Sequence, residues 1–279
     1  MARIRKLVTS LSRRGPHKVL RGDLAFAGLP GVVYTPESGL NLPGIAFGHD
    51  WLTATTRYSG LLEHLASWGI VAGAPDTERG LVPSVLNLAS DLGTALDIVA
   101  GVRLGPGDIS VHPAKLGVVG HGFGASAAVF AAAGMPGALA ATVAVFPTVT
   151  TPPAEQPATS LTVPGLILTA PGAPKTLNSN ALALSSAWSS ATLRIVSKAE
   201  PAGLCEGRRL ASVVGLPGSN RRTQRSVRAL LTGYLLATLA GDKTYRDFAD
   251  PDMVLPKTTP LDPEAEPIAL EEKIVALLK

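Results

Sequence analysis

The stretch from Gly120 to Ala125, GHGFGA, is the part of the chain whose residue types and spacing point most directly to chemistry. It follows an apolar run and precedes an alanine-rich run, which predicts a turn between a strand and a helix. In the pattern G-x-S-x-G, such a turn presents a serine nucleophile, but Gly122 stands where the serine would be. The pattern G-x-G-x-x-G/A, which cradles a dinucleotide, also fits.

Two features of the sequence disfavour nucleotide binding. The strand expected after the turn ends near Phe146 without the acidic residue that would hold a ribose. The turn also lies in the middle of the chain, whereas the dinucleotide fingerprint normally opens the first strand–helix–strand unit. No cofactor is expected.

The elements that must position this turn follow from alternating patterns along the chain. Continuous apolar runs between helical patterns are typical of a mostly parallel central sheet with helices on both faces, and thus of the α/β class. We expect one such domain, with strands at 31–34, 43–48, 69–74, 115–120, 141–146, 164–169 and 192–196 and helices at 58–68, 83–102, 124–134, 178–189 and 222–240.

Several segments, taken in order, carry a family resemblance. They read HDWLTAT, LASWGIVAGAPDT, HPAKLGVVGHGFGASAAVFAAA, VPGLILTA and RSVRALLTGYLLATLAGDKTYRDF. Over residues 20–250 the chain resembles the dienelactone-hydrolase-like α/β-hydrolases, most closely the branch of polyester-degrading cutinases and related lipases. The resemblance implies an α/β-hydrolase fold with Gly122 at the apex of the nucleophile elbow.

The resemblance also implies a catalytic serine, aspartate and histidine, in that order, and none of them is present. The nucleophile position is Gly122, the acid loop carries Ala173, and the segment for the base ends at Pro201. No acidic residue occurs in 156–199, and no histidine follows His121. Because hydrolysis needs all three groups, we expect a pseudoenzyme with a degenerate elbow and no catalytic residue.

A vestigial pocket is the second implication. The backbone amide of Phe123 and one near Trp51 would form an oxyanion hole that could hold a carbonyl or carboxylate oxygen. His121 is expected to be structural, and His49 and Asp50 are not expected to pair as base and orienter because neighbouring side chains diverge. These two and His121 could converge on a metal ion, but three ligands of unknown geometry do not predict a metal site.

The other candidate groups have ordinary structural interpretations. Ser126 lies four residues past the apex and is expected to pack in the first helical turn. His17, His64 and His112 read as surface or loop residues. The single cysteine, Cys205, excludes an internal disulfide framework and a cysteine-based zinc site.

Positive charge is concentrated at the amino-terminal end. The net charge is +4, yet residues 1–24 hold seven cations and one anion, so the remainder is slightly acidic and does not resemble a nucleic-acid-binding domain. Residues 2–12 have helical apolar spacing with cations between, which suits either packing on the domain or an anionic surface. The expected basic patch comprises Arg3, Arg5, Lys6, Arg13, Arg14, Arg221, Arg225 and Arg228.

We therefore divide the chain into a basic segment (1–22), an α/β-hydrolase-like domain (23–248), and a tail rich in proline and acid (249–279) with a short amphipathic helix at 268–279. The expected function is that of an inactive binding or assembly module, with a protein partner, an oligomer or an anionic membrane surface as its target. The alternatives are an ester or lipid hydrolase with an atypical catalytic set and an acyl-ligand carrier. We expect a cytoplasmic protein, peripheral to the inner face of the membrane where it binds lipid.

Overall fold

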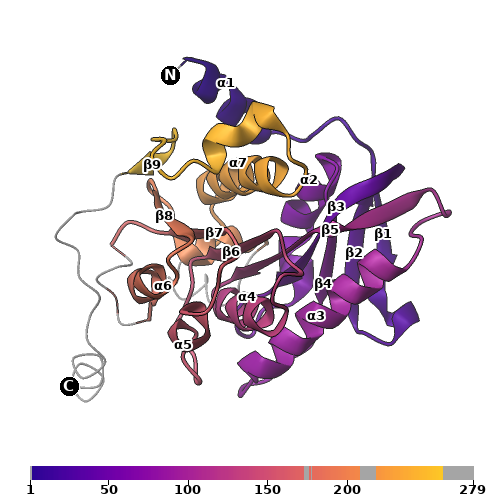
Figure 1. Ribbon diagram of the computed structural model, residues 1–279, viewed down its shortest axis with the longest axis horizontal. Coiled ribbons are helices and arrows are strands. Elements are labelled where there is room, and N and C mark those ends of the chain that lie inside the picture. Colours follow the sequence, from indigo (N-terminus) through magenta and orange to yellow (C-terminus); the bar gives the residue numbers. More distant parts are fainter. Residues whose placement is uncertain (1, 173–175, 177, 208–217, 260–279) are drawn as a thin grey trace.

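A computed structural model describes residues 2–172, 176, 178–207 and 218–259. It is an α/β fold in which one sheet lies between two layers of helices, as the alternating pattern predicts (Figure 1). Within the described residues the sheet has nine strands in the order β1-β2-β4-β3-β5-β6-β7-β8-β9. Their bounds are β1 (Val19–Asp23), β2 (Gly31–Pro36), β3 (Gly39–Gly48), β4 (Val71–Pro75), β5 (Ile109–His121), β6 (Ala141–Val145), β7 (Gly165–Thr169), β8 (Ala191–Val196) and β9 (Thr258–Thr259).

The sheet is parallel from β4 through β8, and its antiparallel pairs lie toward the two edges, where β2 joins β1 and β4 and β9 joins β8. Each of the seven apolar runs forms a strand. The edge strands β1 and β9 were not expected, because β1 is mostly exposed and β9 is two residues long, so neither carries an apolar signature. β1 also begins at Val19, within the basic segment 1–22 that was expected to lie outside the α/β domain.

The helices are α1 (Ala2–Leu11), α2 (Ser59–Ser67), α3 (Val85–Gly101), α4 (Phe123–Gly134), α5 (Glu155–Ala158), α6 (Ala181–Ala187) and α7 (Arg221–Thr238). Short 3-10 helices, η1 (Leu24–Ala27), η2 (Thr55–Tyr58), η4 (Pro201–Leu204) and η6 (Lys243–Phe248), lie between them. Two side-chain caps fix helix starts, since Ser84 accepts from an amide of α3 and Asn220 accepts from two amides of α7.

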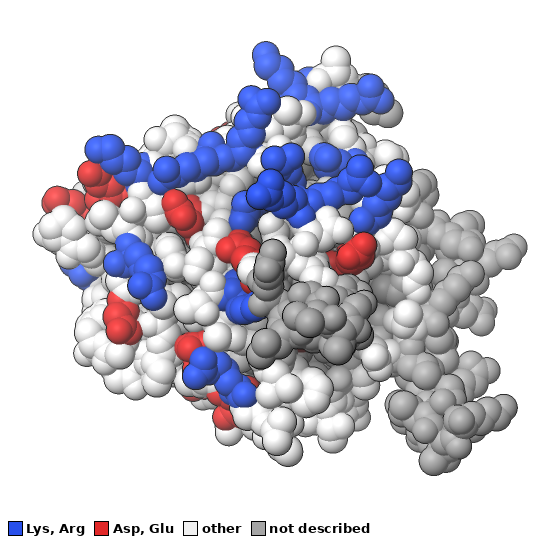
Figure 2. Space-filling view, turned by 180° about the vertical axis from the view of Figure 1, so that it is seen from behind, with Lys and Arg blue, Asp and Glu red and all other residues white. Residues whose placement is uncertain are grey.

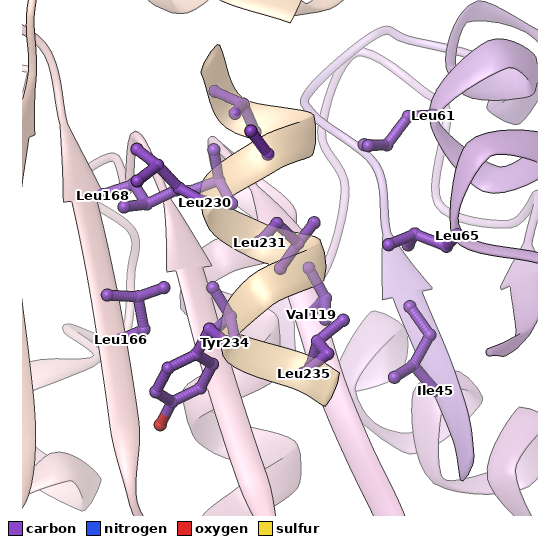
Figure 3. Packing of buried hydrophobic residues seen from close by; sticks show 14 of the residues in the cluster. Ile45, Leu61, Leu65, Val119, Leu166, Leu168, Leu230, Leu231, Tyr234 and Leu235 are labelled. Carbon is purple, nitrogen blue, oxygen red and sulfur yellow. The ribbon is translucent and has the colours of Figure 1, made fainter. Parts of the chain in front are cut away.

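Both faces of the sheet are buried, which is why its central strands read as unbroken apolar runs. Alternate side chains such as Val118 and Val119 contribute to separate clusters, one under α3, α4, α5 and α6 and the other under α1, α2 and α7. In the second cluster α7 lays Leu230, Leu231 and Leu235 across the sheet (Figure 3). Each fully buried leucine contributes about 1.5–3 kcal/mol of transfer free energy.

The amino-terminal helix packs on the domain. Ile4, Val8 and Leu11, which share one face of α1, are buried in the same cluster as α7, and α1 lies against α7 (Figure 1). The apolar stripe expected from the sequence is therefore covered by the protein itself, and the cations of α1 face solvent.

Residues 249–259 run through turns to β9, while 260–279, including the expected helix at 268–279, lie outside the described residues. None of the helices in the described ranges combines the length and the apolar character needed to cross a bilayer.

Candidate functional site

The turn between β5 and α4 has the strained backbone that its glycines suggest. Gly122 has φ 56° and ψ −117°, a conformation that costs an L-residue about 1–3 kcal/mol. A Cβ on Gly124 would overlap the carbonyl group of Gly48, and a Cβ on Gly120 would overlap Gly124. The turn therefore needs glycine at 122 for its dihedral angles, at 124 for the close approach of β3 to α4, and at 120 for the close approach of β5 to the first turn of α4.

Asp50 occupies the space above this turn. Its Oδ1 accepts hydrogen bonds from the backbone amides of Trp51 (2.9 Å) and Phe123 (3.0 Å). These two amides match the predicted oxyanion donors, and they converge on one oxygen, which belongs to the chain's own carboxylate. A Cβ on Gly122 would overlap the same Oδ1, so Asp50 lies where the side chain of an apex residue would begin.

The Asp50 carboxylate also completes the start of α4. The residue before the helix, Gly122, has no side chain to cap it, and the amide of Phe123 is one of the first-turn donors without an intrahelical acceptor. Asp50 supplies that acceptor and places its negative charge at the positive end of the helix dipole, an arrangement worth about 0.5–2 kcal/mol.

A buried hydrogen-bond network lies beneath Asp50. The Tyr58 hydroxyl accepts from the Asp50 amide (3.0 Å), lies 2.8 Å from His121 Nδ1, and accepts from the thiol of Cys205 (3.5 Å). His121 Nε2 lies 3.2 Å from the carbonyl oxygen of Pro201. With the proton on Nε2, His121 donates to Pro201 and accepts from Tyr58, so one tautomer satisfies every contact.

Electrostatics in this network follow from its burial. Burial raises the pKa of Tyr58 well above its usual value, and the nearby Cys205 and Asp50 add to the rise. Burial by itself lowers the pKa of His121, but the Cys205 thiol and the Asp50 carboxylate outweigh it, so that the net shift is upward.

His49 fastens two loops and does not orient Asp50. Its ring is fully buried, with Nδ1 2.9 Å from the carbonyl oxygen of Asp50 and Nε2 2.7 Å from that of Thr77. The loops after β3 and β4 are thereby held together. In the described part of the chain, no three histidine, cysteine, aspartate or glutamate residues are grouped as metal ligands would be.

The remaining predicted positions have structural surroundings or lie outside the described residues. Pro201 begins η4, and its carbonyl ties the segment expected to hold a base back to His121. Ser126 is buried and donates to the Thr148 carbonyl at 2.7 Å. Ala173 is not among the described residues.

One interpretation from the sequence is wrong: His64 is not a surface residue. It lies in α2, 5% exposed, beneath the carboxyl end of α1. Burial, and then the positive charge of Arg228, lowers its pKa to about 4, against a smaller opposing effect of a hydrogen bond to the Leu11 backbone. Because α2 is covered by the sheet, α7 and α1, a polar residue of this helix can be buried, as His64 is.

The structure divides the expected basic patch. Arg228 is three-quarters buried at its side chain and pairs with Glu206 at 2.7 Å, so its charge is compensated. Arg14 makes an exposed ion pair with Glu63 at 3.5 Å. The other six residues are exposed on α1, the segment after it and the first turns of α7, namely Arg3, Arg5, Lys6, Arg13, Arg221 and Arg225. Figure 2 shows that lysine and arginine side chains gather on one face of the molecule.

Sequence reasoning missed the roles of Tyr58 and Cys205, and it did not foresee that Asp50 fills the amide pair. Nothing in the local pattern around Tyr58 signals its place under the turn, because that place depends on where η2 lies against β5.

Comparisons with known proteins do not assign the chain to a family. No protein-family model matches it, and no curated protein is similar enough in sequence to count as a relative.

Proposed function

We propose that this protein is a non-hydrolytic member of the α/β-hydrolase-like proteins and that it acts as a binding or assembly module. A strained strand-to-helix turn at Gly122, on a central strand of a mostly parallel sheet, supports kinship with that fold. The convergence of the Trp51 and Phe123 amides supports it further, since such a pair is the oxyanion-binding part of an elbow.

The observation that carries the proposal is the position of Asp50. In ester hydrolysis, amides of this kind stabilise negative charge that develops on the substrate oxygen, and each is worth about 10²–10³ in rate. Here a full negative charge already accepts from both amides. A second anionic oxygen at about 4 Å would be repelled by about 1 kcal/mol in water and more in a partly buried site.

The same observation weighs against the alternative functions. An acyl-ligand carrier would have to displace the Asp50 carboxylate before its ligand could reach the amides. A hydrolase would need a nucleophile at the apex, where Gly122 offers none and the Asp50 carboxylate lies where a side chain would begin.

Turnover of p-nitrophenyl acetate, p-nitrophenyl butyrate and a polyester film tests the first half of the proposal. We expect hydrolysis at the buffer rate for the wild type, for Gly122→Ser, and for Gly122→Ser combined with Asp50→Ala, because a serine without a base and an acid gains little. Asp97→Ala, at an exposed position of α3, is the control for a generic loss of one carboxylate. Wild-type turnover that persists through repurification and disappears in Asp50→Ala would overturn the proposal.

Support for a binding role comes from the carboxyl edge of the sheet. Large apolar side chains are exposed on the loops after β3, β4 and β6 and on the first turn of α3, which all lie at this edge: Trp51, Leu52, Leu81, Val82, Leu86 and Val149. Val82 is 94% exposed and Leu81 77%. Exposed apolar groups gathered around one site are typical of a protein-binding surface.

A photo-crosslinking residue placed at Val82 tests this role in the producing cell. We expect a discrete adduct with a second copy or with another protein. The matched position is Leu40, which is also well exposed but lies at the start of β3, at the opposite edge of the sheet. Adducts of equal yield at both positions, or none at Val82, would contradict binding through the carboxyl edge.

A further inference from the structure

Seven exposed cations lie on α1, on the segment after it and on the first turns of α7. We call this surface the cationic face, and it consists of Arg3, Arg5, Lys6, Arg13, Arg221, Arg222 and Arg225. In the described part of the chain none of these side chains forms an ion pair with an acidic residue. The face is therefore a concentration of positive charge that the protein leaves to solvent or to a partner.

The packing of α1 brings the two halves of this face together. The Arg3 guanidinium donates to the Thr244 carbonyl (3.3 Å), beyond the carboxyl end of α7. At the other end of α1, Leu11 and Arg228 both lie next to His64. The two helices thus run in opposite directions, and the segment carrying Arg13 continues to the carboxyl end of α2, where it meets Trp68.

A cleft of about 740 Å³ lies at the carboxyl end of α1, where side chains of this helix and the following segment face Trp68. Its backbone is fixed by hydrogen bonds, since Trp68 Nε1 donates to the Arg13 carbonyl (3.1 Å) and the Gly15 amide donates to Ser67 Oγ (2.9 Å). Its lining combines cations with hydroxyl groups: Arg5, Lys6, Thr9, Ser10, Arg13 and Arg14, with Gly15, Pro16 and Trp68. Cations and hydroxyl donors on a fixed backbone suit the oxygen atoms of a phosphate group.

The distribution of apolar side chains indicates which anionic partner fits. The apolar stripe of α1 is buried, so the large side chains that this helix exposes are cationic. Among the described residues, the large exposed hydrophobics are at the carboxyl edge, on β1 and the η1 turn after it, at Leu40 or at Val254, and none is on α1 or α7. Protein interfaces draw most of their affinity from a buried apolar and aromatic centre. Adsorption to an anionic bilayer needs no such centre.

We propose that the cationic face binds the surface of an anionic membrane, with a lipid headgroup phosphate entering the cleft beside Trp68. In this orientation α1 lies flat against the headgroups through its charged side while its apolar side stays on the protein. None of the seven residues belongs to the Gly122 turn or to the exposed apolar set at the carboxyl edge, so the inference stands independently of the proposed function.

The electrostatics set the size of the effect. Each cation near an anionic membrane adds to the free energy of binding, and its removal lowers the membrane partition coefficient about fivefold. Three such removals give a loss on the order of a hundredfold. Screening acts within about 8–10 Å at physiological salt, so binding must weaken as salt rises.

Co-sedimentation of the full chain with vesicles is the test. The vesicles contain equal parts of phosphatidylcholine and phosphatidylglycerol, and pure phosphatidylcholine vesicles serve as the neutral reference. We expect salt-sensitive binding to the anionic vesicles alone and an approximately hundredfold loss in the variant with Arg5→Gln, Lys6→Gln and Arg13→Gln. The matched control removes the same charge elsewhere, with Arg21→Gln, Arg103→Gln and Lys115→Gln, and we expect it to bind as the wild type does.

Three results would overturn the proposal. They are equal loss in the two triple variants, equal binding to neutral vesicles, and binding to polyglutamate without binding to anionic vesicles, which would indicate an acidic protein instead. Calorimetric titration with inorganic phosphate separates a membrane from a soluble ligand, and tight phosphate binding without vesicle binding also overturns it. Should the triple variant fail to fold, the salt dependence of the wild type and the fivefold loss in Arg5→Gln alone remain decisive.

Discussion

The turn at Gly122 and the cationic face differ in whether their polar and charged groups are paired within the chain. At the turn, the converging amides, the buried hydroxyl and the ring nitrogens all have partners within the chain, and the carboxylate of Asp50 fills the central position. On the cationic face, seven positive charges have no acidic partner among the described residues. Leaving donors unpaired in a partly buried site is costly, whereas water solvates exposed cations at little cost. Groups free to bind a partner are therefore found on the face and not at the turn.

The largest expected effect breaks the turn itself. In Gly124→Ala the new Cβ would overlap the carbonyl group of Gly48, and no flexible side chain is there to move away. We expect a loss of about 3 kcal/mol in the free energy of unfolding, measured by urea denaturation. Gly134→Ala, at the end of the same helix with open space around it, is the control and should change stability by much less.

A smaller effect separates backbone strain from overlap with Asp50. At Gly122, valine meets both the positive φ and the carboxylate, so Gly122→Val should cost about 2–3 kcal/mol and Gly122→Ser less. Asp50→Ala alone should lower the free energy of unfolding by about 1 kcal/mol, because α4 loses its cap. In this background, a side chain at position 122 no longer overlaps a carboxylate.

Melting temperatures of these variants form a double-mutant cycle. We expect Gly122→Ser to cost at least about 0.5 kcal/mol less in the Asp50→Ala background than in the wild type. Strict additivity would show that Asp50 does not press on the apex.

Acid should weaken the junction beneath the cationic face. The pKa of His64 is lowered to about 4 in the folded protein, so between pH 6.5 and pH 4 the unfolded chain binds more protons, and stability falls as pH falls. From pH 7 to pH 5 we expect a loss of about 2 kcal/mol in the free energy of unfolding.

The urea midpoint measured across this pH range checks the expectation, with His64→Gln as the comparison. This variant removes the titrating group and should show a shallower pH dependence. Equal slopes in the two proteins would mean that other groups account for the acid sensitivity.

The smallest effect compares two arginines three residues apart on α7. Arg228→Gln breaks the pair with Glu206 and should cost about 1 kcal/mol in stability while leaving vesicle binding unchanged. Arg225→Gln should leave stability within about 0.5 kcal/mol and lower vesicle binding about fivefold. Thermal melts and vesicle co-sedimentation of both variants measure the two quantities, and an exchange of the two outcomes would contradict the division of the basic patch.

Much of the fold follows from the sequence because its signals are local. Apolar runs such as 164–169 correspond to central strands that are buried on both faces, and the spacing of Ile4, Val8 and Leu11 predicts α1. The edge strands carry no such signal, since β1 is paired on one side and its side chains remain largely exposed.

The candidate site was predictable in its backbone and not in its side chains. Gly122 and the amide of Phe123 follow from the turn, and the amide near Trp51 was expected from the family resemblance. The direction of the Asp50 side chain, the position of Tyr58 and the burial of His64 depend on contacts between elements far apart in the chain. Such contacts produce no periodic pattern in the sequence from which they could be predicted.

The three tryptophans occupy three different environments, so the fluorescence of each can report on a different part of the protein. Trp188 is fully buried in the layer of α3, α4, α5 and α6, Trp51 is half-exposed beside Asp50, and Trp68 lines the cationic cleft. Quenchers carried on lipid headgroups would dim the emission of Trp68 when the cationic face meets a membrane. A water-soluble quencher would report on Trp51, and the emission of Trp188 would shift only when the core opens. Single-tryptophan variants would thus let one fluorescence experiment follow the surface, the turn and the core separately.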